Sequence, residues 1–363
     1  GQNGASSLGK ASAVPSMTPI QTKGETFMEQ KYMDYLVEQA KNLLAIPSPT
    51  GYNQEIQAYL REELARLGYP ETTGPRRGGV SCHIGGEGNP ITLTAHADTL
   101  GAMVRHIKDN GSLMITPIGG LNANNVETSN VEIITKFDGK YSGTIQVENA
   151  SVHVNPEVNA PRSFDTNIEV LIDEDVHCPE DVRKLGIEVG DFVTLDPRTV
   201  VTSSGYIKSR FLDDKVCCAI LLAYAKYVKE ENVKLPRAVW LHFSVYEEIG
   251  TGGATLIPQD AHDIVAVDMG CVGELQTGSE RKVTLCAKDS KGPYHYEFLK
   301  ELAKVCIDHK VDYVVDTYFR YGSDVEGSLT AGYDARHITM GPGVYASHGY
   351  ERTHISGLEQ TYE

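Results

Sequence analysis

The alternation of apolar and polar residues predicts four helices. Apolar positions recur every three or four residues in the first two stretches, and in the second of them Ile56, Leu60 and Leu64 fall on one face. Asp213 and Asp214 begin the third stretch, where the helix dipole favours negative charge. The predicted helices cover residues 28–44, 54–67, 213–230 and 294–309.

Short apolar runs rich in β-branched residues lie between these helices and predict strands. They cover residues 80–84, 90–95, 238–245, 263–268, 282–286 and 311–317. Strands that alternate with helices predict an α/β fold, in which a mixed, mainly parallel sheet is covered by helices on both faces.

The character of the chain changes between residues 104 and 206. Helical periodicity disappears there, and short β-prone pieces alternate with Gly, Asn and Pro turns. These pieces are 131–135, 141–147 and 192–195. We therefore predict that residues 104–206 form an all-β, barrel-like domain, inserted into an α/β catalytic domain made of residues 28–103 and 207–363.

Composition and charge narrow the classes of partner and compartment. The formal net charge of −16 disfavours nucleic acid and anionic membranes, because both are bound by clustered Lys and Arg. Neither a long apolar run nor a signal peptide is visible, so we predict a cytoplasmic protein. The seven cysteines lack paired zinc spacing and are predicted to be reduced and mostly buried. Residues 1–27, which precede Met28 and lack an initial Met, are predicted to be a leader foreign to the protein.

The pair Glu247-Glu248 stands where the predicted strand 238–245 meets a glycine-rich turn. In an open α/β sheet, the carboxyl ends of the strands form the edge at which ligands bind. One carboxylate there can hold a metal ion while its neighbour transfers a proton. An isolated Glu pair is more often a solvated acidic loop, so the other candidate residues decide between the two interpretations.

Four further side chains are candidate ligands beside Glu248, and four of these five residues stand just after an apolar strand or at a helix start. With Glu248 they make two histidines and three carboxylates, enough to hold two divalent ions that share one carboxylate. This candidate set is His96, Asp213, Glu248, Asp268 and His348. Asp98 is a candidate partner for the second N–H of the His96 imidazole, whose orientation it would fix. Taken singly, such residues are more often structural or helix caps, and their order along the chain is what carries information.

In sequence and in order, these motifs resemble the cytosolic dinuclear zinc aminopeptidases of metallopeptidase family forty-two. That family includes glutamyl, deblocking and tetrahedral aminopeptidases, and some members have been labelled endoglucanase. The resemblance runs from about Met28 to the end of the chain. It rests on His96-Ala97-Asp98 with Gly101, Leu212-Asp213-Asp214-Lys215, Tyr246-Glu247-Glu248-Ile249-Gly250, Val267-Asp268 and Ser347-His348, and in the insert on residues 115–120 and Gly190-Asp191.

The resemblance implies a role for each predicted ligand. His96, Asp213 and Asp268 would hold one metal ion. Asp213 would bridge to a second ion, held also by Glu248 and His348. The resemblance implies zinc for both ions, and cobalt and manganese accept the same ligand set.

The same resemblance implies an aminopeptidase with Glu247 as its general base and Asp98 in its catalytic centre. It would remove N-terminal residues from short peptides with metal-activated water, and Glu247 would return the proton to the leaving amine. The fold would be that of the zinc exopeptidases, and the β insert would mediate assembly into a homododecamer. No nucleic acid or membrane partner is implied. Residues 291–293 and 322–324 resemble family loops near the substrate channel, and ordinary turns are equally expected there.

Two places depart from the family pattern. Thr99 stands where most relatives have Glu. Glu351 follows His348 by three residues rather than four, and His354 is a competing last ligand, with His348 preferred. Glu351 and Arg352 either shape the pocket or form a surface ion pair.

Three other functions remain open. A dinuclear deacylase of N-acyl amino acids or a carboxypeptidase would bind a substrate carboxylate, for which Arg210 and Arg352 are candidates. A glycoside hydrolase (an endoglucanase) would pair Glu247 with another carboxylate, but it leaves both histidines unexplained and the chain has one Trp for sugar stacking. A peptide-binding scaffold would keep the fold without the metals, although all five ligands and the base are present. The preferred N-terminal residue cannot be read from the sequence.

Overall fold

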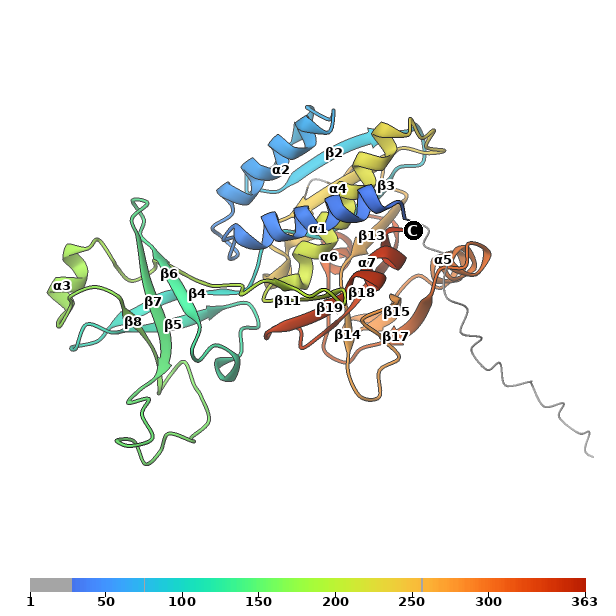
Figure 1. Cartoon of the computed structure of the whole chain (residues 1–363). Helices are drawn as coiled ribbons and strands as arrows, with labels where there is room; N and C mark the ends of the chain where they lie inside the picture. The colour runs from blue at the N-terminus through green and yellow to red at the C-terminus, as the bar shows by residue number, and fades with distance from the viewer. Residues whose placement is uncertain (1–27, 75, 256) are drawn as a thin grey trace, which may run out of the picture.

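The computed structural model describes residues 28–74, 76–255 and 257–363. They form an α/β body from which a small closed barrel projects (Figure 1). The predicted α/β class is confirmed. The prediction of a foreign leader falls on residues 1–27 and lies outside the described residues.

A 13-stranded mixed sheet forms the centre of the body. Its main path, in spatial order, is β1 (Thr72–Thr73), β2 (Val80–Gly85), β12 (Val239–Ser244), β3 (Ile91–His96), β13 (Asp263–Val267), β18 (Arg336–Tyr345), β19 (Glu351–His354), β11 (Tyr206–Ser209) and β10 (Val200–Val201). Off this path lie β14 (Gly270–Val272), β15 (Val283–Asp289), β16 (Gly292–Pro293) and β17 (Tyr313–Thr317). The four central strands β12, β3, β13 and β18 run parallel, and β13 is buried along its whole length, as expected for a strand of a sheet covered on both faces.

Helices cover both faces of this sheet (Figure 1). They are α1 (Gln30–Ala45), α2 (Gln54–Arg66), α4 (Leu212–Glu230), α5 (Tyr296–Asp308), α6 (Asp324–Thr330) and α7 (Ile355–Tyr362). Leu93 of β3 lines the same apolar cavity as Ile220 of α4. The adjacent Thr94 donates a hydrogen bond of 2.7 Å to Asp324 of α6. Because neighbouring side chains of a strand point to opposite faces, α4 and α6 lie on opposite sides of the sheet.

The predicted helices are present, with one local difference at α4. Asp213 and Asp214 lie within its first turn, but their backbone is not helical: ψ is 101° at Asp213 and φ is −125° at Asp214. They therefore leave the helical path and do not act as ordinary first-turn residues. The short helices α6 and α7 were not predicted, because seven or eight residues give too few apolar positions to reveal a period.

The insert contains the predicted barrel. Its strands are β4 (Gly101–Ile107), β5 (Leu113–Ile118), β6 (Asn130–Ile134), β7 (Lys140–Val147), β8 (Ile168–Ile172) and β9 (Phe192–Leu195), closed in the order β4-β5-β8-β7-β6-β9 around a separate apolar core. Besides these strands the insert contains one short helix, α3 (Pro179–Lys184), and the 3-10 turn η1 (Ala123–Asn125), neither of which was predicted. The barrel also begins before residue 104, at Gly101. The strand β10, placed in the insert by the sequence, belongs to the large sheet, as does β11, which begins at the predicted boundary, Tyr206. The division into domains stays a prediction.

Two compositional predictions can be compared with the structure. All seven cysteines are free and five are buried, as predicted. Among the described residues, no helix is both long and apolar enough to cross a membrane.

A buried ion-pair triad fixes the start of β13. The Oδ2 atom of Asp263 accepts a hydrogen bond of 2.6 Å from Arg237 Nη1, and its Oδ1 atom accepts one of 2.6 Å from Arg336 Nε. Burial alone would raise the pKa of the Asp263 carboxyl, but hydrogen bonds from Arg336, Arg237 and His262 lower this pKa from 3.8 to about 2. The triad thus connects the segment just before β12 with the first residues of β13 and β18.

Replacing Asp263 by Asn is expected to lower the free energy of unfolding at pH 7 by roughly 2–4 kcal/mol, because two arginines lose their partner. A carboxyl whose pKa is lower in the folded state stabilises the protein above its unfolded pKa, and this contribution is lost as the pH falls through the folded pKa. The shift corresponds to about 2 kcal/mol, lost between about pH 4 and pH 2. Urea unfolding at pH 7 and pH 3 should show the difference between variant and wild type shrinking at the lower pH. A difference that is the same at both pH values would contradict this account, and Asp312→Asn on the exposed pair with Lys282 is the matched control.

Candidate active site

Four predicted site residues emerge at one edge of the parallel strands. His96 is the last residue of β3, and Asp268 directly follows β13. Glu247 and Glu248 follow β12 in the 3-10 turn η2 (Glu247–Ile249). Ser244, the last residue of β12, pairs with His96 in the strand register, so the two carboxyl ends coincide. This edge is where an open α/β sheet binds its ligands.

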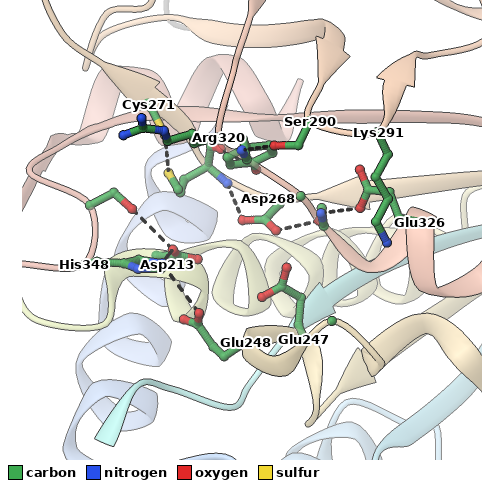
Figure 2. A pocket seen from close by; sticks show the side chains of 16 residues that line it. Asp213, Glu247, Glu248, Asp268, Cys271, Ser290, Lys291, Arg320, Glu326 and His348 are labelled. Carbon is green, nitrogen blue, oxygen red and sulfur yellow. Dashed lines mark hydrogen bonds and ion pairs between the residues drawn. The ribbon is translucent and has the colours of Figure 1, made fainter. Parts of the chain in front are cut away.

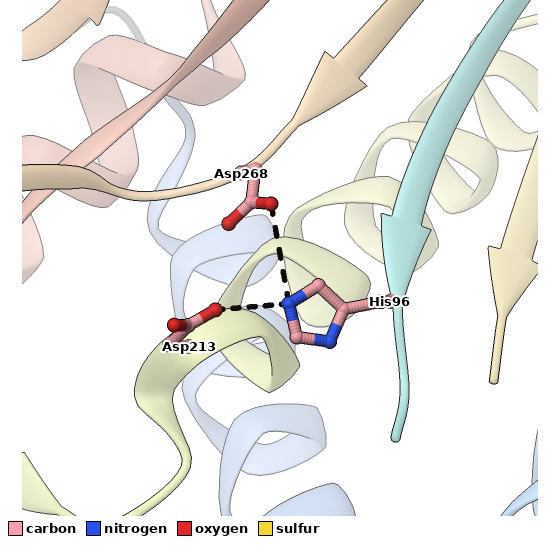
Figure 3. A group of neighbouring side chains, drawn as sticks. All are labelled: His96, Asp213 and Asp268. Carbon is pink, nitrogen blue, oxygen red and sulfur yellow. Dashed lines mark hydrogen bonds and ion pairs between the residues drawn. The ribbon is translucent and has the colours of Figure 1, made fainter. Parts of the chain in front are cut away.

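One group of potential metal ligands consists of His96, Asp213 and Asp268 (Figure 3). The His96 Nε2 atom lies 2.9 Å from Asp213 Oδ1 and 3.9 Å from Asp268 Oδ2. All three side chains are buried, and their ligand atoms lie within 4.8 Å of one another. Asp268 is itself held, because its Oδ2 accepts a hydrogen bond of 2.5 Å from Ser323 Oγ.

A second group consists of Asp213, Glu248 and His348 (Figure 2). His348 comes from the turn between β18 and β19, and its Nε2 atom lies 3.3 Å from Asp213 Oδ2 and 3.5 Å from Glu248 Oε2. Asp213 thus presents one oxygen to each histidine. The structure brings together all five predicted ligands in the two groups that the resemblance implies, and their role as ligands stays a prediction. The ligand atoms of His96, Glu247 and Glu248 also lie within 4.8 Å of one another, so these three residues form a third possible ligand group.

The electrostatics of these groups favour a positive charge among them. Burial and the nearby Asp213 carboxylate raise the pKa of Glu248 to about 8 and that of Asp268 to about 7. Burial would also raise the pKa of Asp213, but hydrogen bonds from His348 and His96 hold it below its usual range. Burial would lower the pKa of His348, yet its contacts with Asp213 and Glu248 raise it to about 10. The raised pKa values of Glu248 and Asp268 reflect both burial and the crowding of several negative charges at this place. A divalent cation would neutralise that charge, and carboxylates and imidazoles are its usual ligands.

Glu247 faces the same cavity as these groups (Figure 2). Its Oε2 atom lies 3.3 Å from His96 Nε2. Burial raises the pKa of Glu247 well above the usual value, and Asp268 and Glu248 add to this, while His96 acts in the opposite direction. A carboxyl with a raised pKa is suited to accept and release a proton near neutral pH.

The structure gives Asp98 a different contact from the predicted one. The His96 Nδ1 atom is 2.9 Å from the main-chain carbonyl of Asp98, whereas the carboxylate Oδ1 is 3.6 Å away. The carboxylate instead accepts hydrogen bonds from the backbone N–H groups of Glu247 (3.1 Å) and Glu248 (3.2 Å) and from the Thr50 hydroxyl (2.6 Å). Asp98 therefore orients His96 through its backbone and the Glu pair through its side chain.

Glu351 and Arg352 do not pair with each other. Arg352 Nε donates to Glu280 Oε1 at 2.9 Å, away from the cavity, and is partly exposed. Glu351 is buried and accepts hydrogen bonds from the backbone N–H groups of Asp213 (3.1 Å) and His348 (3.2 Å). Of the two alternatives left by the sequence, Glu351 supports the site and Arg352 forms the peripheral ion pair.

Three other candidates lie outside the two groups. His354 caps α7, where its Nδ1 accepts the N–H of Ser356 at 3.0 Å. The Thr99 hydroxyl donates to the Leu100 carbonyl at 2.8 Å. Arg210 is buried and donates to the Asn125 carbonyl and, at 2.9 Å, to Ser129 Oγ. The guanidinium of Arg210 is thus engaged with the insert and does not line the main cavity.

A cavity of about 540 Å³ opens over the site. Besides the acidic groups it is lined by two exposed cations, Lys291 and Arg320, and by Ser290, Tyr321 and Glu326. The predicted channel loops at 291–293 and 322–324 do contribute to this lining, through Lys291, Gly322 and Ser323. Sequence reasoning missed Arg320 because this residue lies in no motif.

A family model described as M42 glutamyl aminopeptidase matches residues 78–363. The chain belongs to this family. It is therefore a peptidase of the aminopeptidase type, and the metallopeptidase family implies divalent metal ions, for which the two side-chain groups are the candidate sites. The resemblance noted in the sequence is confirmed.

Known relatives and solved structures agree with this assignment. YhfE of Bacillus subtilis, which carries the name of an aminopeptidase, is 42% identical over 327 residues, covering 90% of this chain and 94% of that protein. The glutamyl aminopeptidase of Lactococcus lactis is 25% identical over 224 residues, 60% of this chain and 61% of that protein. A TET aminopeptidase from a marine-sediment thaumarchaeote shares the fold with a TM-score of 0.81 at 16% identity, over 91% of this chain and 94% of that one. The TET1 peptidase of Pyrococcus horikoshii also shares the fold, with a TM-score of 0.79 at 19% identity, over 90% of this chain and 97% of that one. That peptidase can assemble into a tetrahedron or a large octahedral shell.

Proposed function

We propose that the protein is a dinuclear-metal aminopeptidase that removes N-terminal residues from short peptides. The observation that carries this proposal is the position of Asp213, whose Oδ1 lies 2.9 Å from His96 Nε2 and whose Oδ2 lies 3.3 Å from His348 Nε2. A carboxylate so placed can be shared by two cations. His96 and Asp268 would complete one position, and Glu248 and His348 the other.

Two divalent cations held there would supply Lewis acidity, which lowers the pKa of water and polarises the scissile carbonyl. Glu247 performs the proton transfers: its carboxylate takes a proton from the attacking water and later gives it to the departing amine. Asp98 keeps the Glu247 carboxylate in place through the two backbone N–H groups of the Glu pair. The acidic wall of the cavity gives the free α-amino group of a peptide a counter-charge, which restricts cleavage to the first residue.

Metal, compartment and assembly follow from the same proposal. Zinc is the proposed metal, with cobalt and manganese compatible with the same ligands. We propose a cytoplasmic location and a homododecamer in which the barrel makes subunit contacts. The support for assembly is the fold shared with TET peptidases, one of which was solved as a dodecamer. Light scattering of the protein as it elutes from a size-exclusion column would measure the mass of the assembly. Dividing that mass by the 39.7 kDa of one chain gives the number of subunits.

A deacylase or a carboxypeptidase is the second candidate function. Arg210 and Arg352, its expected carboxylate-binding residues, do not line the main cavity, but Lys291 and Arg320 do. These two cations can receive a substrate carboxylate in either class of enzyme. A glycoside hydrolase is less well supported, because Trp240 packs against His83, with ring centroids 5.1 Å apart, and does not line the cavity.

Lys291 and Arg320 are expected to favour acidic substrates. Neither forms an ion pair with another described residue, although the chain carries a net charge of −16. Replacing both by Gln should lower the ratio of kcat/KM for glutamyl over leucyl p-nitroanilide by roughly 5–10-fold, since exposed charge pairs contribute modestly. Steady-state kinetics of the double variant beside Lys300→Gln, on the exposed pair with Glu297, measure this ratio. An unchanged ratio would exclude the two cations from substrate selection.

The experiment that tests the proposed function is hydrolysis by the metal-reconstituted protein. Aminoacyl p-nitroanilides are compared with their N-acetylated counterparts and with a β-glucan. Cleavage of free-amine substrates alone supports the aminopeptidase. Cleavage of N-acylated substrates alone would identify a deacylase, and release of sugar from the glucan a glycoside hydrolase.

A further inference from the structure

Glu351 stands where two separate parts of the site meet. It is the first residue of β19 and is 2% exposed. In the sheet it pairs with Ser209 of β11, and the chain continues from that strand through two residues to the start of α4. The turn that precedes Glu351 carries His348. The sequence offered no decision on its role, and the general-base assignment does not use it.

The Glu351 carboxylate bridges the main chains of two proposed ligands. Its Oε2 atom accepts the N–H of Asp213 at 3.1 Å, and its Oε1 atom accepts the N–H of His348 at 3.2 Å. Resting on the proposed function, we infer that Glu351 is a positioning residue that sets the separation of Asp213 and His348. It thereby gives the Asp213–Glu248–His348 position its affinity for a cation.

His348 needs such support because of its own conformation. Its φ of +65° lies in the left-handed region, which a non-glycine residue rarely adopts without constraint. Its ring is held separately: Nδ1 is 3.2 Å from the carbonyl oxygen of Gly120, and a Cβ at residue 120 would lie only 2.7 Å from that nitrogen. The Glu351 carboxylate fixes the backbone of His348 while the insert fixes the ring.

The effect of Glu351 should be unequal at the two positions. His96 is oriented through Asp98, and Asp268 through Ser323 and the backbone N–H of Met269, so these ligands do not depend on Glu351. Apart from Glu351, no side chain among the described residues hydrogen-bonds the backbone of His348. Losing Glu351 therefore weakens the position that contains His348 more than the one that contains His96.

Glu351→Gln tests whether Glu351 acts through its two hydrogen bonds or only through the volume of its side chain. Gln has the same shape, but only one of its two terminal atoms can accept a hydrogen bond, so its amide nitrogen must face the N–H of Asp213 or His348. The matched control is Glu280→Gln, which alters the carboxylate paired with the adjacent Arg352. Glu351→Asp is a second variant: it keeps the charge, but is one methylene shorter and cannot reach both N–H groups.

Calorimetric titration of the chelator-treated full chain with Zn²⁺ tests the inference without relying on activity. Wild type and Glu280→Gln should bind two ions. Glu351→Gln and Glu351→Asp should bind the first ion with affinity close to wild type and the second about 10–100-fold more weakly, as is typical when the partner of a ligand is lost. Retention of the first ion shows that a variant is folded. Two ions bound to Glu351→Gln within twofold of the wild-type affinities would overturn the inference, whereas wild type that binds no ion would overturn the proposed function on which it rests.

Discussion

Glu247→Gln is expected to lower kcat for aminoacyl p-nitroanilides by a factor of about 10²–10⁴, the usual contribution of a positioned general base. The amide has the shape of the carboxylate but cannot take a proton from water or return it to the leaving amine. Burial, together with the neighbouring Asp268 and Glu248, also raises the pKa of Glu247 well above its usual value, which suits this carboxyl to both transfers. KM should change little, because the loss concerns the transition state.

The number of bound metal ions decides what a loss of activity in Glu247→Gln means. Glu247 lies outside the two groups that share Asp213, so the variant should still bind two ions. Glu247 does meet His96 and Glu248 within 4.8 Å, however, and loss of an ion would identify it as a ligand instead. Activity close to wild type would exclude it as the base. Glu297→Gln, on the exposed pair with Lys300, controls for a general effect of removing a carboxylate.

Asp213→Asn is expected to weaken both cation positions at once, by more than the roughly 10–100-fold typical for the partner of a ligand. One substitution reaches both positions because Asp213 Oδ1 faces His96 and Asp213 Oδ2 faces His348. Asn keeps the shape but removes the negative charge that two cations would share. Metal analysis after dialysis, together with kcat, measures the effect, and activity should fall with metal content.

Asp268→Asn is the matched comparison within the site. Asp268 belongs to the group with His96 but not to the group with His348. The substitution Asp268→Asn should therefore weaken binding of one ion, whereas Asp213→Asn should weaken binding of both. If Asp213→Asn retained one full ion at wild-type affinity, Asp213 would not be the shared ligand.

The α/β sheet and the convergence of its strand ends could be predicted from the sequence because both depend on local signals. Apolar runs mark the strands, and His96, Glu247 and Asp268 lie at or just after the ends of three of them. The parallel pairing of β12, β3 and β13 then brings these residues to one edge without further information. Asp213 and His348 arrive from a helix start and a turn. The sequence offered both as candidate ligands, and the resemblance implied which ion each would hold.

The supporting contacts could not be predicted, because they depend on main-chain positions far apart in the sequence. Spacing alone suggested that the Asp98 side chain would meet His96. In the fold, the Asp98 backbone takes that place, and its carboxylate holds N–H groups about 150 residues away. Glu351 likewise accepts an N–H from Asp213, 138 positions earlier in the chain. Arg210, expected near a substrate, is held by the insert instead.

The extent of the insert was also beyond the sequence pattern. A β-prone stretch does not show which sheet it joins, and β11 pairs with β19 at the other end of the chain. The first barrel strand continues almost directly from the turn after His96, so no change in composition marks its start at Gly101. Pairing partners decide such boundaries.

The most direct test of the central claim is to titrate chelator-treated protein with Zn²⁺ while following hydrolysis of an unblocked peptide and its N-acetylated form. The account predicts no turnover without metal, activity that rises until two ions are bound per chain, and no cleavage of the acetylated peptide. Full activity in the presence of chelator, or activity complete with no ion bound, would contradict a dinuclear-metal aminopeptidase.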